Sequence, residues 1–289
     1  MSNKTKRLFF TKMHGAGNDY IYIDATTQSV NNPEELSKRL SHRHTGVGAD
    51  GLVLIAPSVK AHYAMRIFNA DGSEALMCGN ALRCVGKYLY DNKMIEGLRA
   101  TIETKSGLRH LQLQVGEEGV ENVTVDMGEP LLANVMQVNT ADGHLNDVII
   151  NVAGMDYSPT YVCMGNPHVV CFVDDVANIK LHEVGSFIES HELFPQKTNV
   201  EFAQIINPSL ISMRVWERGS GETQACGSGA CATLVAACVK EHCIRKAQVE
   251  MPGGTLMIEW NNNDNHIYMT GEVVTVFTGV VEVECDEII

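Results

Sequence analysis

Two stretches of the chain share one pattern. Residues Met65–Asn80 read MRIFNADGSEALMCGN, and residues Met213–Ser228 read MRVWERGSGETQACGS. They align without a gap at an offset of 148 residues (226 − 78), with Met, Arg, Glu, Cys and Gly at matching places. Gly17-Asn18 falls on Gly165-Asn166 at the same offset. Because this offset is close to half of the 289 residues, we expect two duplicated halves, each a domain.

Each half combines several strand patterns with about two helical patterns. We therefore predict an α+β fold of two pseudo-symmetric domains, each a mostly antiparallel sheet wrapped around helices, with the active site in the cleft between them. The first domain is expected to cover residues 1–127 and the second residues 128–274. The strand patterns are 52–55, 64–68, 120–127, 161–173, 211–216, 249–260 and 273–283, and the helical patterns are 33–43, 81–93, 181–190 and 230–242.

The composition limits the class of protein. With 22 basic and 35 acidic residues, the net charge is −13, and no basic cluster stands out. We expect a chain that binds neither nucleic acid nor a membrane. The first residues lack the apolar core of a signal peptide, and the longest apolar run, Ala230–Val239, is shorter than a membrane span. A cytoplasmic location with reduced thiols is therefore expected.

Cys78 and Cys226 are the repeated cysteines, and each is followed by glycine and then a helical pattern. A thiol at a helix N-terminus is favoured as a thiolate, and the free N–H groups there can hold a carboxylate. Two such sites on opposite sides of a ligand suit inversion of a carbon that carries an acidic hydrogen. One thiolate would remove the proton, and the other thiol would protonate the opposite face.

The remaining seven cysteines are expected to fill the core or lie inert, as most free cysteines do. They are Cys84, Cys163, Cys171, Cys231, Cys238, Cys243 and Cys285. A zinc site is disfavoured because the cysteine spacings do not match paired Cys-x₂-Cys motifs. Gly46–Gly51 matches G-x-G-x-x-G, but a helical pattern precedes it and a strand follows, which is the reverse of a dinucleotide site.

Several polar residues are candidates for ligand binding. Asn18 and Asn166 are equivalent in the repeat, which favours paired polar contacts to a roughly symmetric ligand. Arg218 is suited to a second carboxylate, because its fork binds a carboxylate through two hydrogen bonds. With two suitable bases already present, no cofactor is expected, including pyridoxal phosphate.

The chain resembles the diaminopimelate epimerase family over essentially its whole length. The last of the matching blocks is highly specific. The blocks are Lys12–Asp19, Gly48–Gly51, Phe68–Ser73, Met77–Cys84, Gly165–His168 and Glu217–Cys231.

The resemblance implies a cofactor-independent epimerase that interconverts LL- and meso-2,6-diaminopimelate for lysine and peptidoglycan precursor synthesis. It implies that Cys78 and Cys226 are the acid/base thiols, that His168 and Glu217 tune their pKa, and that the C-terminal strand, about 275–289, returns to the first domain. The implied substrate-binding residues are Asn18, Asn69, Gly79, Asn80, Asn166, Asn199, Glu217, Arg218, Gly227 and Ser228.

Two alternatives and one departure remain open. A proline racemase-type enzyme would use the same thiol pair but has no need for Arg218, and a zinc or redox thiol protein would use the cysteines without catalysis. Some relatives carry a glutamine ligand where this chain has Gly51, so one substrate contact is lost or supplied in another way. A homodimer is an open alternative to a monomer.

Overall fold

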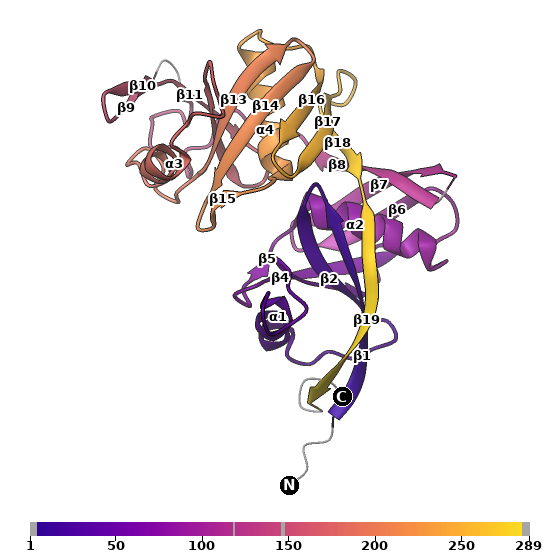
Figure 1. Cartoon of the computed structure of the whole chain (residues 1–289). Coiled ribbons are helices and arrows are strands. Elements are labelled where there is room, and N and C mark those ends of the chain that lie inside the picture. Colours follow the sequence, from indigo (N-terminus) through magenta and orange to yellow (C-terminus); the bar gives the residue numbers. More distant parts are fainter. Residues whose placement is uncertain (1–4, 118, 146–147, 285–289) are drawn as a thin grey trace. The chain divides into compact units, whose positions relative to one another are not determined.

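The computed structural model describes residues 5–117, 119–145 and 148–284 (Figure 1). The chain divides into two compact units. The first comprises the chain up to Val125 together with the residues from Gly271 onward, and the second spans Asp126–Thr270.

The first unit is built mainly from antiparallel strands. Two of its strand pairs, β2–β3 and β4–β6, are parallel. The last strand returns to the first, so that β19 lies antiparallel along β1 from Thr5↔Glu284 to His14↔Val274 (Figure 1). The elements are β1 (Thr5–Gly15), β2 (Asn18–Asp24), α1 (Pro33–Ser41), β3 (Gly51–Ala56), β4 (Tyr63–Asn69), β5 (Glu74–Ala75), α2 (Gly79–Asp91), β6 (Arg99–Thr104), β7 (Gly107–Gly116), β8 (Gly119–Gly128) and β19 (Val274–Glu284).

The second unit repeats this plan. Its parallel pairs, β12–β13 and β14–β16, are the counterparts of those in the first unit. The elements are β9 (Ile150–Val152), β10 (Met155–Tyr157), β11 (Pro159–Cys163), β12 (Pro167–Phe172), α3 (Leu181–Glu189), β13 (Asn199–Asn207), β14 (Leu210–Glu217), β15 (Gly221–Thr223), α4 (Gly227–Val239), β16 (Lys246–Met251), β17 (Gly254–Trp260) and β18 (Ile267–Glu272).

The duplication extends to helix bounds and strand register. Helices α3 and α4 begin and end 148 residues after α1 and α2. The parallel pair Tyr20↔Gly51 in the first unit recurs as His168↔Asn199 in the second, at the same offset. The predicted fold class, a duplicated α+β fold, is therefore confirmed.

The sequence located the helices well but missed two strand breaks. Helix α1 begins at Pro33 with Asn32 as its N-cap, as expected. Helices α2 and α4 begin two and three residues earlier than their apolar periodicity indicated, because glycine and polar residues occupy the first positions, Gly79-Asn80 in α2 and Gly227-Ser228-Gly229 in α4. The runs 161–173 and 249–260 are each two strands, split in the first case by a turn in which Gly165 has φ +91°.

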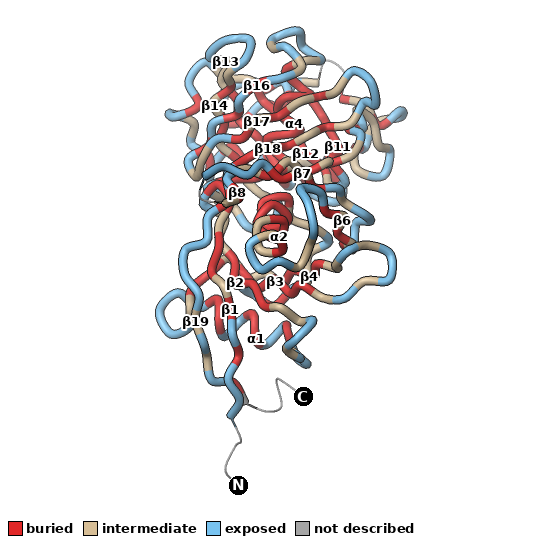
Figure 2. Tube along the Cα trace, turned by 90° about the vertical axis from the view of Figure 1, so that its right-hand side faces the viewer, coloured by how far each residue is buried: buried red, intermediate tan, exposed pale blue. Residues whose placement is uncertain are grey.

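In each unit the hydrophobic core is built around the central helix, α2 in the first unit and α4 in the second. Helix α4 packs against β11, β12, β13, β14, β16 and β17, and its residues from Gly229 to Ala237 are all buried. A helix that is apolar on every side requires such an enclosure. Helix α2 buries residues Gly79–Gly86 and Leu89 in the same way (Figure 2).

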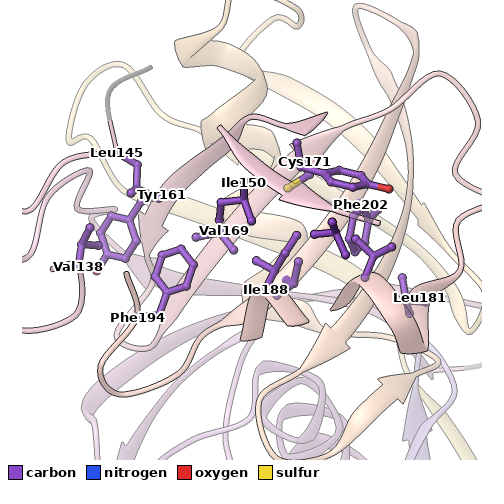
Figure 3. Packing of buried hydrophobic residues seen from close by; sticks show 14 of the residues in the cluster. Val138, Leu145, Ile150, Tyr161, Val169, Cys171, Leu181, Ile188, Phe194 and Phe202 are labelled. Atoms are coloured by element: carbon purple, nitrogen blue, oxygen red, sulfur yellow. The ribbon is translucent and has the colours of Figure 1, made fainter. Parts of the chain in front are cut away.

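A second apolar layer lies between the outer helix and the sheet in each unit. Leu36 and Leu40 of α1 are buried with strand residues of the first unit. Their equivalents Val184 and Ile188 of α3 pack in a cluster with Phe194 (Figure 3). This repeated layer holds α1 and α3 on the sheets whose strands carry the candidate site residues.

Within the part of the chain that the structure describes, no helix is both long and apolar enough to cross a membrane.

Candidate active site

Cys78 and Cys226 occupy the same structural position, the N-cap of a central helix. Both have extended backbone angles, with φ −139° and ψ 120° at Cys78 and φ −128° and ψ 110° at Cys226. Each carbonyl accepts the first helical hydrogen bond, from Leu82 and Ala230 respectively. The next N–H groups, of Gly79-Asn80 and Gly227-Ser228, belong to the first turn, where helices lack internal acceptors. Both thiols therefore lie at the positive end of a helix.

In the first unit, Cys78 contacts Asn18. The Cys78 Sγ lies 3.3 Å from Asn18 Oδ1. Asn18 Nδ2 donates to Asp50 Oδ2 at 2.7 Å, and Asp50 also binds Arg43 at 2.7 Å. A carboxylate accepts hydrogen bonds only, so Asp50 fixes the Asn18 amide with its oxygen toward the thiol.

Asn80 and Tyr20 complete the surroundings of Cys78. Asn80 Nδ2 lies 3.5 Å from Asn18 Oδ1, while Asn80 Oδ1 accepts from the buried Arg83 at 2.9 Å. The Tyr20 hydroxyl interacts with the side chains of Asn18 and Cys78, and burial raises the pKa of Tyr20 well above its usual value. Tyr20 therefore remains a neutral hydroxyl beside the thiol.

Gly51 has no side chain, and the Tyr20 ring packs against the place that a Cβ at residue 51 would take. A Cβ at Gly51 would overlap the Phe68 carbonyl oxygen and lie 3.0 Å from the Tyr20 ring. A side chain at residue 51 is therefore sterically excluded here. The last expected site residue of this unit, Asn69, donates from Nδ2 to Ser73 Oγ at 3.0 Å, within the turn that follows β4.

In the second unit, Cys226 is buried among acidic and hydroxyl groups. It is 6% exposed, and its Sγ lies 3.6 Å from Ser228 Oγ. Glu217 interacts with the thiol and accepts a hydrogen bond from Thr223 Oγ1. Burial, followed by the negative charges of Glu217 and Glu201, raises the pKa of the Cys226 thiol well above its usual value. Burial also raises the pKa of Glu217.

These effects predict slow alkylation of Cys226 at neutral pH. Because the thiolate is the nucleophile, the rate of reaction with iodoacetamide should rise only above pH 9. Glu217→Gln should move that rise to lower pH, since one negative charge beside the thiolate is removed. Peptide mass spectrometry of Cys226 after timed alkylation measures both rates. An unchanged pH profile in Glu217→Gln would show that access alone, not charge, limits the reaction.

His168 and Asn199 link the Cys226 surroundings to neighbouring strands. His168 is fully buried, with Nδ1 2.7 Å from Glu201 Oε1 and Nε2 3.1 Å from Asn166 Oδ1. Asn166 Nδ2 in turn lies 3.5 Å from Ser228 Oγ. Asn199 donates to the Pro167 carbonyl and accepts from the Arg218 N–H, both at 2.9 Å. The Arg218 side chain is exposed, with one guanidinium nitrogen 3.1 Å from the Gln196 carbonyl.

The structure thus gathers the expected site residues into two groups, one in each unit. The first contains Asn18, Cys78, Gly79 and Asn80, and the second contains Asn166, His168, Asn199, Glu217, Arg218, Cys226, Gly227 and Ser228. Among the described residues, no hydrogen bond joins Asn69 to the first group.

Sequence reasoning missed several residues that contact these groups, among them Tyr20, Asp50 and Glu201. The repeat carried a signal for one of them, because Tyr20 aligns with His168 at the offset of 148. Asp50 lies inside a matching family block but directly precedes a strand, where an acidic residue is commonly a surface group. Glu201 lies in an apolar strand without any distinguishing mark.

The other described cysteines are free thiols away from the N-caps. Cys84, Cys171 and Cys231 are at most 1% exposed, and Cys163 is 5% exposed, as expected of core residues. Cys238 and Cys243 are half-buried, and Cys285 lies outside the described residues. Within the described residues, no group of three or more His, Cys, Asp or Glu side chains is arranged to hold a metal ion.

Solved structures of other proteins share this fold. A hydroxyproline epimerase from Agrobacterium vitis matches with a TM-score of 0.70 at 15% identity, covering 98% of this chain and 93% of that one. A phenazine biosynthesis protein of the PhzF family from Bacillus anthracis matches with a TM-score of 0.70 at 17% identity, covering 96% and 100%. The fold is therefore the duplicated α+β fold that these two solved structures share.

Sequence comparisons identify the family. The diaminopimelate epimerase family model matches residues 10–133 and 160–276. The diaminopimelate epimerase of Phocaeicola vulgatus is 52% identical, covering 94% of this chain and 98% of the relative. That of Methanococcus maripaludis strain C6 is also 52% identical, covering 95% and 99%. The chain belongs to the diaminopimelate epimerase family, and it is an isomerase.

Proposed function

We propose that the chain interconverts LL- and meso-2,6-diaminopimelate by a two-base mechanism in which Cys78 and Cys226 act on opposite faces of one α-carbon. One sulfur, as thiolate, takes the α-proton. The other, as thiol, delivers a proton to the opposite face, so that the configuration inverts and the enzyme ends with its protons exchanged. The equivalence of the two N-cap cysteines is the observation that carries this proposal.

The helix ends supply electrostatic stabilisation. As the α-proton leaves, negative charge develops on the substrate carboxylate. The first-turn N–H groups after each cysteine are donors that need no reorganisation to meet that charge. The exposed fork of Arg218 is suited to the distal carboxylate, which diaminopimelate has and proline lacks. Asn18, Asn69, Asn80, Asn166, Asn199, Glu217 and Ser228 are proposed as further polar contacts to the substrate.

The two thiols lie beside different side chains, so different residues are proposed to tune each of them. Cys78 faces the neutral groups Tyr20 and Asn18. Cys226 faces the acidic side chains Glu217 and Glu201, which raise its thiol pKa. A base and an acid are needed in each turnover, and the unequal surroundings suit the two thiols to different protonation states. His168 and Glu217 are therefore proposed as tuning residues of the Cys226 side.

Deuterium incorporation tests the proposal. Incubation of LL-diaminopimelate with the enzyme in deuterium oxide, without any added cofactor, should yield meso product labelled at the α-carbon. Mass spectrometry and chiral chromatography measure label and configuration together. Absence of both label and meso product would remove the proposal. A parallel incubation with L-proline should yield no label, and labelled D-proline would instead favour a proline racemase-type activity.

The proposal extends to cellular context. An epimerase of this substrate would serve lysine and peptidoglycan precursor synthesis in the cytoplasm, with the small molecule as its partner and with no nucleic acid or membrane involved. It would need no cofactor, because the two thiols supply both the base and the acid.

A further inference from the structure

The second unit contains a buried acid–imidazole pair that the first unit lacks. His168 Nδ1 and Glu201 Oε1 lie 2.7 Å apart, and both side chains are fully buried. At the offset of 148, the first unit carries Tyr20 and Val53 at these two positions. The pair therefore meets a requirement of the Cys226 side and not of the fold that the two units share.

Both ring nitrogens of His168 face acceptor atoms, Nδ1 a Glu201 oxygen and Nε2 the Asn166 Oδ1, which is the arrangement of a doubly protonated ring. The Glu201 Oε2 atom is buried and, among the described residues, makes no hydrogen bond, so His168 is the group that compensates the Glu201 charge. Two further ionisable groups lie nearby. Glu217 interacts electrostatically with His168, and the pKa of the Cys226 thiol is raised by burial and by the charges of both glutamates.

The protonation of His168 determines how Asn166 is turned. An imidazolium donates from both nitrogens, so its Nε2–H meets Asn166 Oδ1 at 3.1 Å. The Asn166 amide nitrogen then points to Ser228 Oγ at 3.5 Å, and that hydroxyl lies 3.6 Å from Cys226 Sγ. A neutral ring with its proton on Nδ1 would offer Asn166 an acceptor at Nε2, and the amide would have to turn over.

The equivalent asparagine of the first unit is held in the opposite sense. Asp50 Oδ2 accepts a hydrogen bond from Asn18 Nδ2 at 2.7 Å, and Asn18 Oδ1 lies 3.3 Å from Cys78 Sγ. The first site therefore presents an amide acceptor and the second an amide donor. Behind Asn18 lies the Asp50 carboxylate, and behind Asn166 lies the His168 ring.

We propose that Glu201 is a positioning residue of the Cys226 site. It holds His168 as an imidazolium, and the imidazolium holds the Asn166 amide with its donor side toward Ser228 and a bound substrate carboxylate. The second part rests on the proposed function, in which Asn166 and Ser228 contact the substrate. The first part concerns the ring alone and can be measured without turnover.

Nitrogen-15 NMR of the imidazole rings tests the first part. With signals assigned through His168→Gln, both His168 nitrogens should be protonated at pH 7 in the wild type, since each faces an acceptor atom. In Glu201→Gln, which keeps the side-chain shape but removes the carboxylate charge, the doubly protonated form of the ring should be lost at pH 7. Glu189→Gln is the matched control, since Glu189 is buried in the same unit but bonds to Trp216 and Gly219. A neutral His168 ring at pH 7 in the wild type would overturn the proposal, whatever the variants do.

Kinetics of LL-diaminopimelate epimerisation test the second part. In Glu201→Gln, KM should rise about tenfold above pH 7, the cost of about one misdirected hydrogen bond, with kcat less affected. KM should return toward the wild-type value as the pH is lowered to 5.5 and His168 is protonated. A loss of kcat alone, equal at every pH, would assign Glu201 a merely structural role and overturn the positioning role. If the wild type does not act on diaminopimelate but its His168 ring is charged, the proposed function fails and the Glu201–His168 inference stands.

Discussion

Replacing either N-cap cysteine by alanine is expected to abolish epimerisation. Each turnover needs one sulfur as base and the other as acid. The N-cap of each central helix is a single cysteine, Cys78 in one unit and Cys226 in the other, so neither can be replaced by a neighbouring thiol at the same position. Positioned acid–base groups contribute roughly 10²–10⁴-fold to a rate, so Cys78→Ala and Cys226→Ala should each lower kcat by about 10³-fold or more. The measurement is the rate of meso-diaminopimelate formation from the LL isomer.

Solvent exchange separates a lost catalytic group from a lost fold. With one thiol removed, the remaining thiolate can still exchange the α-hydrogen of one stereoisomer with deuterium oxide, without inversion. The isomer that continues to exchange in each variant assigns each cysteine to its face of the α-carbon. The control is Cys163→Ala, a buried cysteine away from the N-caps, which should leave epimerisation largely intact. An equal loss in Cys163→Ala would contradict the assigned roles.

The duplication explains why so much of the site was predictable. One repeated Cys-Gly element located both helix starts, and the N-caps at Cys78 and Cys226 follow from it. The same offset relates α1 to α3 and the β2–β3 register to the β12–β13 register. An internal repeat is a long-range signal, so it placed residues together that local propensity alone would not relate.

Glu201 shows where sequence reasoning stops. In an antiparallel strand with one wet face, a glutamate within the run Asn199–Ala203 would be expected to point to water. Here these five residues are all buried, because β13 lies between the central helix α4 on one side and the α3 layer on the other. Burial on both faces removes the alternation that normally marks polar positions, and only the three-dimensional pairing with His168 reveals the role of the carboxylate.

Gly229→Ala is expected to disturb the Cys226 site severely. A Cβ at Gly229 would lie 2.6 Å from Glu201 Oε1 and 3.3 Å from Cys226 Sγ, so it would separate the carboxylate from the thiol. The first unit has Ala81 at the equivalent helix position and Val53 in place of Glu201, so the glycine is required by the carboxylate and not by the helix. We expect a loss of about 1–3 kcal/mol in the free energy of unfolding from overpacking, together with a lowered kcat.

A double-mutant cycle decides whether the carboxylate is the cause. In a Glu201→Ala background the closest clash is gone, and alanine is the better helix former by about 0.5–1 kcal/mol, so Gly229→Ala should there be neutral or stabilising. The two substitutions should therefore cost less together than the sum of their separate effects, by about 1–2 kcal/mol. Urea unfolding of the four proteins measures the cycle. Strict additivity would place the cause of the Gly229→Ala defect at Cys226 and not at Glu201, and would remove the steric link between the acid–imidazole pair and the thiol.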